Sequence, residues 1–235
     1  MSTPHPFDQD LRTRQQIAEI VGIAPDTVAY WSKEGLLKPR QGHAQGRGKH
    51  RMFGKDSIYI AAVLRELSLY GVQTAGLKEV ANLVWGAISI AAEFPDISIS
   101  VLEKAARYRS FQALYEKVTA RRSAAIPEND THKDAEHYKQ FQALFFKPDP
   151  VISDLVPKLD SKDSIRMRFF GDLMLAGQAG TEYQDDPAQS RRWIFYHVDD
   201  QLAAMPESDL DTHDPLSSFI MLDLDQIIQP IASTL

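Results

Sequence analysis

The feature that most constrains this chain is a pair of short helical segments joined by a glycine turn, close to its beginning. Ile17, Ile20 and Val21 recur at the i, i+3, i+4 spacing of one buried stripe on a helix. Thr13 can cap the start of this helix with its hydroxyl, and Gly22 can end it in a left-handed conformation. The pattern therefore predicts a short amphipathic helix that turns sharply into the next element.

A second helix is predicted to begin at Pro25, which suits a first helical position because its missing N–H would have no partner there. Val28 and Trp31 then fall on one face. Gly35 can close the helix, and Pro39 keeps the following segment extended. The order of these elements predicts a helix–turn–helix, with a second helix of the right size to enter a DNA major groove.

The segment Arg40–Phe53 combines basic side chains with glycines. Glycine lets the backbone approach a phosphate closely, and cationic side chains bind phosphates. Taken alone, such a run also fits a solvated loop. Joined to the preceding pair of helices, we interpret it as a basic wing; its basic residues are Arg40, Arg47, Lys49, His50 and Arg51.

Residues 14–84 resemble the DNA-binding domain of the MerR family of winged-helix transcription regulators. The similarity rests on QQIAEIVGIAPDTVAYW, on EGLLKPR, on the wing motif Arg51-Met52-Phe53, and on KDSI, which opens the next helix. VLRELSLYGVQTAGLKEVANLV then resembles the paired helices of that family. The resemblance implies a winged helix–turn–helix that binds double-stranded DNA, and it covers about a third of the chain.

The same resemblance assigns roles to residues. Thr27, Tyr30 and Trp31 are expected to lie on the recognition helix. Tyr30 is expected to contact the DNA backbone, and the Trp31 ring is expected to be shared between the protein core and the edge of the DNA. Arg51 is the wing arginine that meets phosphate. The full set of expected DNA contacts is Arg14, Thr27, Tyr30, Trp31, Lys33, Lys38, Arg40, Arg47, Lys49, His50 and Arg51.

Two positions of the predicted recognition helix depart from the family, which often has arginine where this chain has Asp26 and Ala29. Arginine reads guanine edges or neutralises phosphate, whereas Asp26 repels phosphate. Asp26 can accept a hydrogen bond from cytosine, or it can simply favour the helix N-terminus through the dipole, which we prefer. We therefore expect an operator unlike those typical of the family.

The charge of the chain is distributed unevenly. Residues 11–80 hold 11 Lys or Arg against 6 Asp or Glu, a balance of +5, whereas residues 81–235 hold 15 against 24, a balance of −9. A basic head on an acidic body is expected of a DNA-binding protein with a regulatory or oligomerising module. The chain has no cysteine, which excludes disulfides and thiolate metal sites. No apolar run is long enough to span a bilayer, and residues 1–10 suit a mobile polar tail, so we expect a cytoplasmic protein.

Two further helices are predicted after the head, over Ala75–Glu93 and Ser98–Arg122, with Pro95 between them. Relatives pair two subunits through a long helix at this place, so the resemblance implies a homodimer through Ser98–Arg122. An ordinary helix packed on its own chain is the alternative. We therefore predict a tail at 1–10, a head at 11–84 and a helical connector at 85–122.

The remainder, residues 123–235, is predicted to form an α+β regulatory module. A linker (123–132) and a helix (Lys133–Phe146) should precede three strands of a small antiparallel sheet, and a final helix (Asp225–Ile231) should cover it. In related regulators such a module binds an effector. The predicted strands are Ile165–Leu175, Arg192–Val198 and Ser218–Leu224.

No catalytic, cofactor or metal site is predicted. The acidic stretch 209–214 lacks the glycine and bidentate glutamate of a calcium loop. His197 is not accompanied by a serine or cysteine in a sequence pattern typical of a nucleophile. His132 and His137 do not share a helix face. Aromatic residues of the C-terminal half are expected to form core rather than line a ligand pocket; they are Phe169, Phe170, Trp193, Phe195 and Tyr196.

The sequence thus predicts a dimeric transcription regulator of MerR type on a near-palindromic operator. The family resemblance implies regulation by DNA distortion, with RNA polymerase affected only indirectly. Repression by occlusion of the promoter is equally consistent with these residues. Two alternatives stay open. One is an architectural or recombination accessory protein without an effector, and the other is a ligand-binding protein or enzyme that the head targets to DNA.

Overall fold

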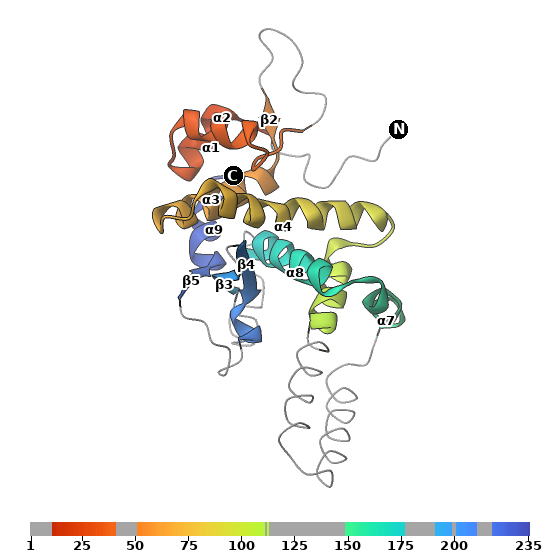
Figure 1. Ribbon diagram of the computed structural model, residues 1–235. Coiled ribbons are helices and arrows are strands. Elements are labelled where there is room, and N and C mark those ends of the chain that lie inside the picture. The colour runs from red at the N-terminus through yellow and green to blue at the C-terminus, as the bar shows by residue number, and fades with distance from the viewer. Residues whose placement is uncertain are drawn as a thin grey trace. The chain divides into compact units, whose positions relative to one another are not determined.

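A computed structural model describes most of the chain (Figure 1). Residue contacts divide it into two compact units, one formed by residues up to 86 together with 169–235 and the other by residues 87–168. The described residues are 11–40, 51–110, 112, 149–176, 191–198, 201–210 and 218–235.

The first unit begins with the predicted pair of helices, α1 (Arg14–Val21) and α2 (Pro25–Lys33). Thr13 and Gln16 form a capping box at the start of α1, which satisfies two amides of its first turn. Gly22 ends α1 with a φ of 73°, a left-handed conformation that side chains rarely adopt. The local signals at both ends of α1 are therefore confirmed.

A two-stranded antiparallel sheet joins the start of the domain to the end of the wing, because β1 (Arg12–Thr13) pairs with β2 (Met52–Phe53). Two longer helices follow, α3 (Lys55–Leu69) and α4 (Thr74–Glu93). Buried apolar residues from all these helices and from β2 form the core of the head; they include Ile17, Val28, Leu36, Leu37, Phe53, Ile58, Leu64 and Val80.

The same unit contains a three-stranded antiparallel sheet in the order β4-β3-β5, made of β3 (Arg192–Val198), β4 (Gln201–Pro206) and β5 (Phe219–Asp223). Helix α9 (Leu224–Ala232) follows β5 directly and packs against α3. Leu202 of β4 lies close enough to Gly76 of α4 that a Cβ there would be 3.4 Å from it. The C-terminal sheet and helix thus belong to the same unit as the winged head.

Four of the five aromatic residues predicted to form core in the C-terminal half are buried, whereas Tyr196 is only half-buried. Phe169, Trp193 and Phe195 are fully buried, and the rings of Phe169 and Trp193 meet edge to face at 4.9 Å between centroids. The Trp193 indole N–H donates to Asp172 Oδ2 at 2.9 Å. A buried indole needs such an acceptor, so this pair fixes the ring orientation.

The second unit is helical in its described part. It contains a helix over residues 99–110, then α7 (Pro150–Leu155) and the short 3-10 helix η1 (Val156–Lys158). Asp149 caps α7 by accepting from the Val151 amide at 2.9 Å. The helix α8 (Ser161–Ala176) begins in this unit and continues into the first.

Two assignments made from the sequence are wrong. Ile165–Leu175, predicted as a strand, lies inside α8. Most of its apolar residues are buried on every side, which removes the periodicity that separates helix from strand. Residues 201–206, predicted as loop, form β4, whose six residues contain no β-branched side chain.

Several predictions fall on residues that the structure does not describe. The tail 1–10, most of the wing, the linker 123–132, the helix 133–146 and the distal part of Ser98–Arg122 lie outside the described residues, as do His132, His137 and most of the acidic stretch 209–214.

Candidate nucleic-acid interface

Helix α2 presents two distinct faces. Val28 and Trp31 point into the core, and Trp31 is only 4% exposed, so its ring is assigned to the core and has little surface left for DNA. Tyr30 is 46% exposed, and Lys33 is exposed as well. Thr27 is half-buried. The outward face of α2 therefore carries hydroxyl and ammonium groups, the chemistry that contacts phosphates.

Tyr30 is held in place from a neighbouring element. Its phenol oxygen lies 3.2 Å from the Thr74 hydroxyl oxygen at the start of α4. This contact restrains a long side chain before any ligand arrives, which lowers the entropy cost of binding. Sequence reasoning identified Tyr30 and missed Thr74, because the partner is 44 residues away along the chain.

The wing is tied to the same helix. The Arg51 guanidinium donates from Nη1 to the Ser32 hydroxyl at 3.3 Å, and the Arg51 side chain is otherwise exposed. The end of the wing therefore lies beside Ser32 of α2. The wing residues Arg47, Lys49 and His50 are outside the described residues.

The other predicted cations differ in their surroundings. Arg14 is exposed at the start of α1. The Lys38 ammonium lies 5.2 Å from the centre of the Trp85 ring, a cation–π distance, while its side chain stays exposed. The Arg40 guanidinium forms an ion pair with Asp56 at 3.0 Å. Of the predicted DNA-contacting cations that the structure describes, Arg40 is the most buried.

An ion pair fastens the end of α2 to α4. Lys78 Nζ lies 2.8 Å from Glu34 Oε2. The hydrogen bond and charge of Lys78 lower the pKa of Glu34, and the same contact raises the pKa of Lys78. The pair therefore stays fully charged throughout the neutral range, although solvent screening keeps its contribution to stability small.

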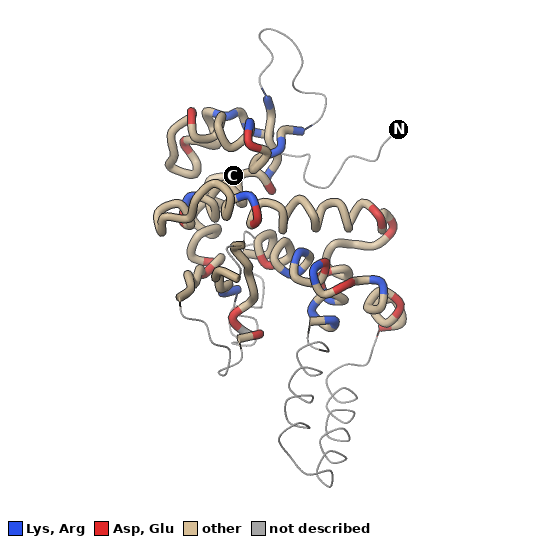
Figure 2. Tube along the Cα trace, in the orientation of Figure 1, with Lys and Arg blue, Asp and Glu red and all other residues tan. Residues whose placement is uncertain are grey.

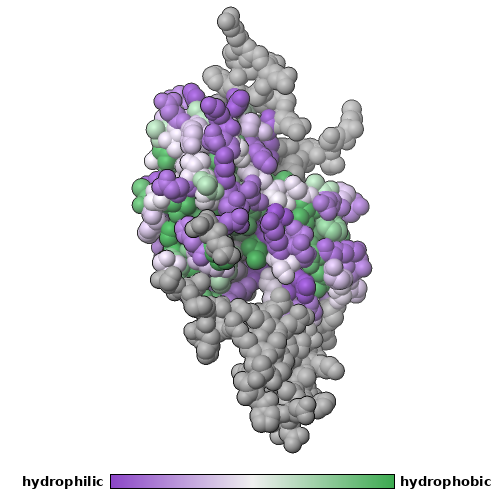
Figure 3. All heavy atoms as spheres, viewed as in Figure 1, coloured by the Kyte–Doolittle hydropathy of each residue, from purple (hydrophilic) through white to green (hydrophobic). Residues whose placement is uncertain are grey.

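The basic and acidic positions of the head are interspersed, as Figure 2 shows around α1, α2 and β2. Hydrophilic residues cover much of the α1 and α2 surface in the view of Figure 3. Asp26 is exposed in the first turn of α2, where the helix dipole stabilises a carboxylate. The position of Asp26 is thus consistent with the preferred role, a favourable interaction with the helix dipole.

Two short helices joined by a glycine turn, with β2 paired back to β1 at the start of the domain, are the elements expected of a winged helix–turn–helix domain. Residues 13–83 match the family described as MerR HTH family regulatory protein. This match, which covers under a third of the chain, supports an N-terminal MerR-family DNA-binding domain. No curated protein and no solved structure matches the chain.

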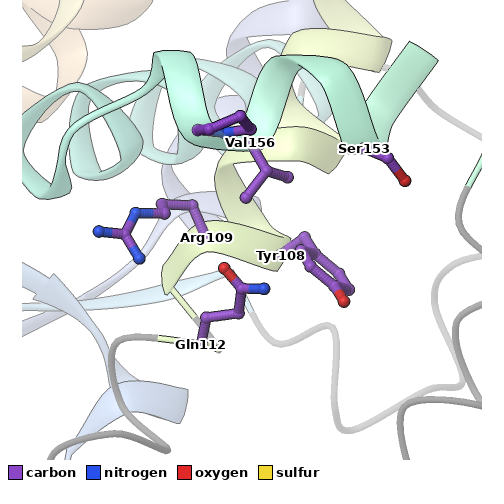
Figure 4. A pocket seen from close by; sticks show the side chains of 6 residues that line it. Tyr108, Arg109, Gln112, Ser153 and Val156 are labelled. Atoms are coloured by element: carbon purple, nitrogen blue, oxygen red, sulfur yellow. The ribbon is translucent and has the colours of Figure 1, made fainter. Parts of the chain in front are cut away.

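A pocket of about 530 Å³ opens in the second unit. Tyr108, Arg109 and Gln112 line it from one helical stretch, and Ser153 and Val156 line it from the segment that contains α7 and η1 (Figure 4). The described lining combines one cation, three neutral polar side chains and apolar surface. Within the described residues, no group of three metal-binding side chains is found. No described helix is long and apolar enough to cross a bilayer.

Proposed function

We propose that this protein regulates transcription as a homodimer that places α2 of each subunit in a major groove of a near-palindromic operator. The observation that carries the proposal is that Arg51 at the end of the wing contacts α2, the helix on which Tyr30 and Lys33 are exposed. Two-fold symmetry then requires half-sites separated by a whole number of helical turns.

Each contact has a role in this proposal. Tyr30, Lys33 and Arg51 bind phosphates, and Thr27 faces the bases. Arg14 and Lys38 add charge at the rim, and the wing residues Arg47, Lys49 and His50 extend the phosphate contact. These contacts set the position of the protein on the duplex, and the sequence read-out comes from α2 and from DNA deformation.

The dimer is proposed to form through Ser98–Arg122, whose described part is helical over residues 99–110. Regulation would follow from distortion of the promoter or from occlusion, so that RNA polymerase is affected indirectly. Activity in the cytoplasm follows from this function, since the operator lies in the chromosome.

Arg51→Ala should weaken binding on all duplexes and lower the slope of log K against log salt by about one unit, because one phosphate contact is lost. Tyr30→Ala should weaken binding without that change in slope, since its hydroxyl is uncharged. Genome-wide mapping of bound DNA, combined with salt titrations of purified protein, measures both effects. Wild-type occupancy by both variants would show that the contact surface lies elsewhere.

We further propose that an anionic small molecule acts as effector in the pocket of the second unit. The Arg109 guanidinium supplies the charge for a carboxylate, and Val156 supplies apolar surface beside it.

Calorimetry with benzoate as the probe should show binding that Arg109→Ala weakens at least tenfold, and Lys104→Ala serves as a control with the same charge change. Equal affinity of the wild type, Arg109→Ala and Lys104→Ala for benzoate would contradict the effector proposal. Absence of benzoate binding by the wild type would contradict it as well.

A further inference from the structure

The base of the wing is closed by the backbone and by one short stretch of α3. The Arg40 amide donates to the Met52 carbonyl at 2.8 Å, so the two ends of the wing meet there. The Ser57 hydroxyl in the first turn of α3 donates to the Lys38 carbonyl at 3.2 Å. The chain is thus held both where it enters the wing and where it leaves.

Side chains reinforce this closure. The Arg40 guanidinium donates to Asp56 Oδ1 at 3.0 Å, and Asp56 is completely buried while the Arg40 side chain is 18% exposed. The same Asp56 oxygen accepts from the Ser57 amide at 2.9 Å. A buried carboxylate depends on such partners, because removing one of them leaves its charge poorly compensated.

Gly54 makes this contact sterically possible. A Cβ on Gly54 would lie 2.6 Å from Arg40 Nη2 and 2.8 Å from Asp56 Oδ1, distances that real Cβ atoms do not show. The φ of Gly54 is −83°, so the glycine is needed here for space and not for backbone conformation. The guanidinium therefore lies directly over the backbone of the residue that joins β2 to α3.

We propose that Arg40, Gly54, Asp56 and Ser57 form a wing anchor, and that Arg40 acts on DNA binding as a positioning residue and not as a phosphate contact. The inference rests on the proposed function of the head. Its physical basis is that the Arg40 charge is already compensated by Asp56, while the ion pair links the wing to α3. Loss of the anchor leaves the residues that flank the wing, 38–40 and 51–57, to be ordered at the moment of binding, which weakens affinity.

The two roles of Arg40 predict opposite signs for a neighbouring variant. Asp56→Asn removes a negative charge near the phosphates, so electrostatics alone would strengthen DNA binding. If the anchor positions the wing, the same variant must weaken binding. Gly54→Ala changes no charge and should weaken binding as well, because its methyl group separates Arg40 from Asp56.

The experiment measures the dissociation constant of full-length Arg40→Ala, Asp56→Asn and Gly54→Ala for a fluorescein-labelled duplex by anisotropy. Arg65→Ala and Glu66→Gln are matched controls, since they make the same charge changes in a partly exposed ion pair on α3. We expect all three anchor variants to bind about tenfold more weakly and the double variant Arg40→Ala/Asp56→Asn to be no worse than either single one. Tighter binding by Asp56→Asn, with additive effects in the double variant, would overturn the proposal.

Hydrogen exchange of the free protein gives a readout that needs no DNA. The anchor variants should exchange faster at residues 38–40 and 51–57, and the controls should not. Unchanged exchange would also overturn the anchor, whereas failure of the wild type to bind duplex would overturn only the proposed function. If a variant lost protection throughout α1 and α3, Arg40→Lys would replace it, because lysine keeps the charge and loses the planar fork.

Discussion

Trp193→Ala should lower the free energy of unfolding by about 4 kcal/mol, the largest effect we expect from one substitution in the C-terminal half. Trp193 is the largest fully buried side chain described, and its loss would leave a cavity beside Phe169 and remove the hydrogen bond to Asp172. Calorimetric or circular-dichroism melts should show the midpoint falling by about 10 °C.

Trp193→Phe is the matched control, because it keeps an aromatic ring and loses the indole N–H. It should cost about 1–2 kcal/mol. Since α9 packs on α3, hydrogen exchange in α3 should also accelerate in Trp193→Ala. A melt indistinguishable from that of the wild type would contradict the packing described for this sheet, and unchanged exchange in α3 would contradict its cooperation with the head.

Reversing two charges of the proposed interface, in Lys33→Glu/Arg51→Glu, should weaken binding to duplex DNA about 100-fold at moderate salt. Each reversal removes a phosphate contact and adds a repulsion, and phosphate contacts dominate affinity. Anisotropy titrations at several salt concentrations measure both the affinity and the slope, and the slope should fall by at least about two units.

Lys158→Glu/Lys162→Glu is the control for net charge, since it changes the total by the same amount on the second unit, outside the head. The Lys158–Asp154 pair, at 2.7 Å, is solvent-exposed, so its loss should cost little folding free energy. The control should bind within about twofold of the wild type, because neither lysine belongs to the proposed contact surface and a change of net charge alone removes no phosphate contact. Equal losses in both double variants would mean that total charge, and not the surface of α2 and the wing, governs binding.

The head could be predicted from the sequence because its signals are local. A threonine cap, a left-handed glycine and a proline at the first helical turn fix α1 and α2 to within a residue, since each acts on its own few neighbours. The family resemblance covered the same part of the chain. The face of α2 that is buried also follows from the spacing of Val28 and Trp31.

Features that depend on distant partners could not be predicted in this way. The pairing of β4 with β3 defines a strand that its own composition does not favour. Arg40 and Asp56 are 16 residues apart, so no periodic pattern relates them. Arg40 was therefore interpreted as one more cation of the wing. In α8 the strand assignment failed because a run of buried apolar residues is compatible with both kinds of element.

The central claim is that the basic N-terminal domain binds the double helix through α2 and the wing. The most direct test is a titration of the purified full-length protein against labelled fragments of its own chromosome, repeated from low to physiological salt. We predict saturable binding whose log K falls linearly with log salt, with a slope that Arg51→Ala reduces by about one unit. Absence of binding at the lowest ionic strength, or binding that is insensitive to salt, would contradict it.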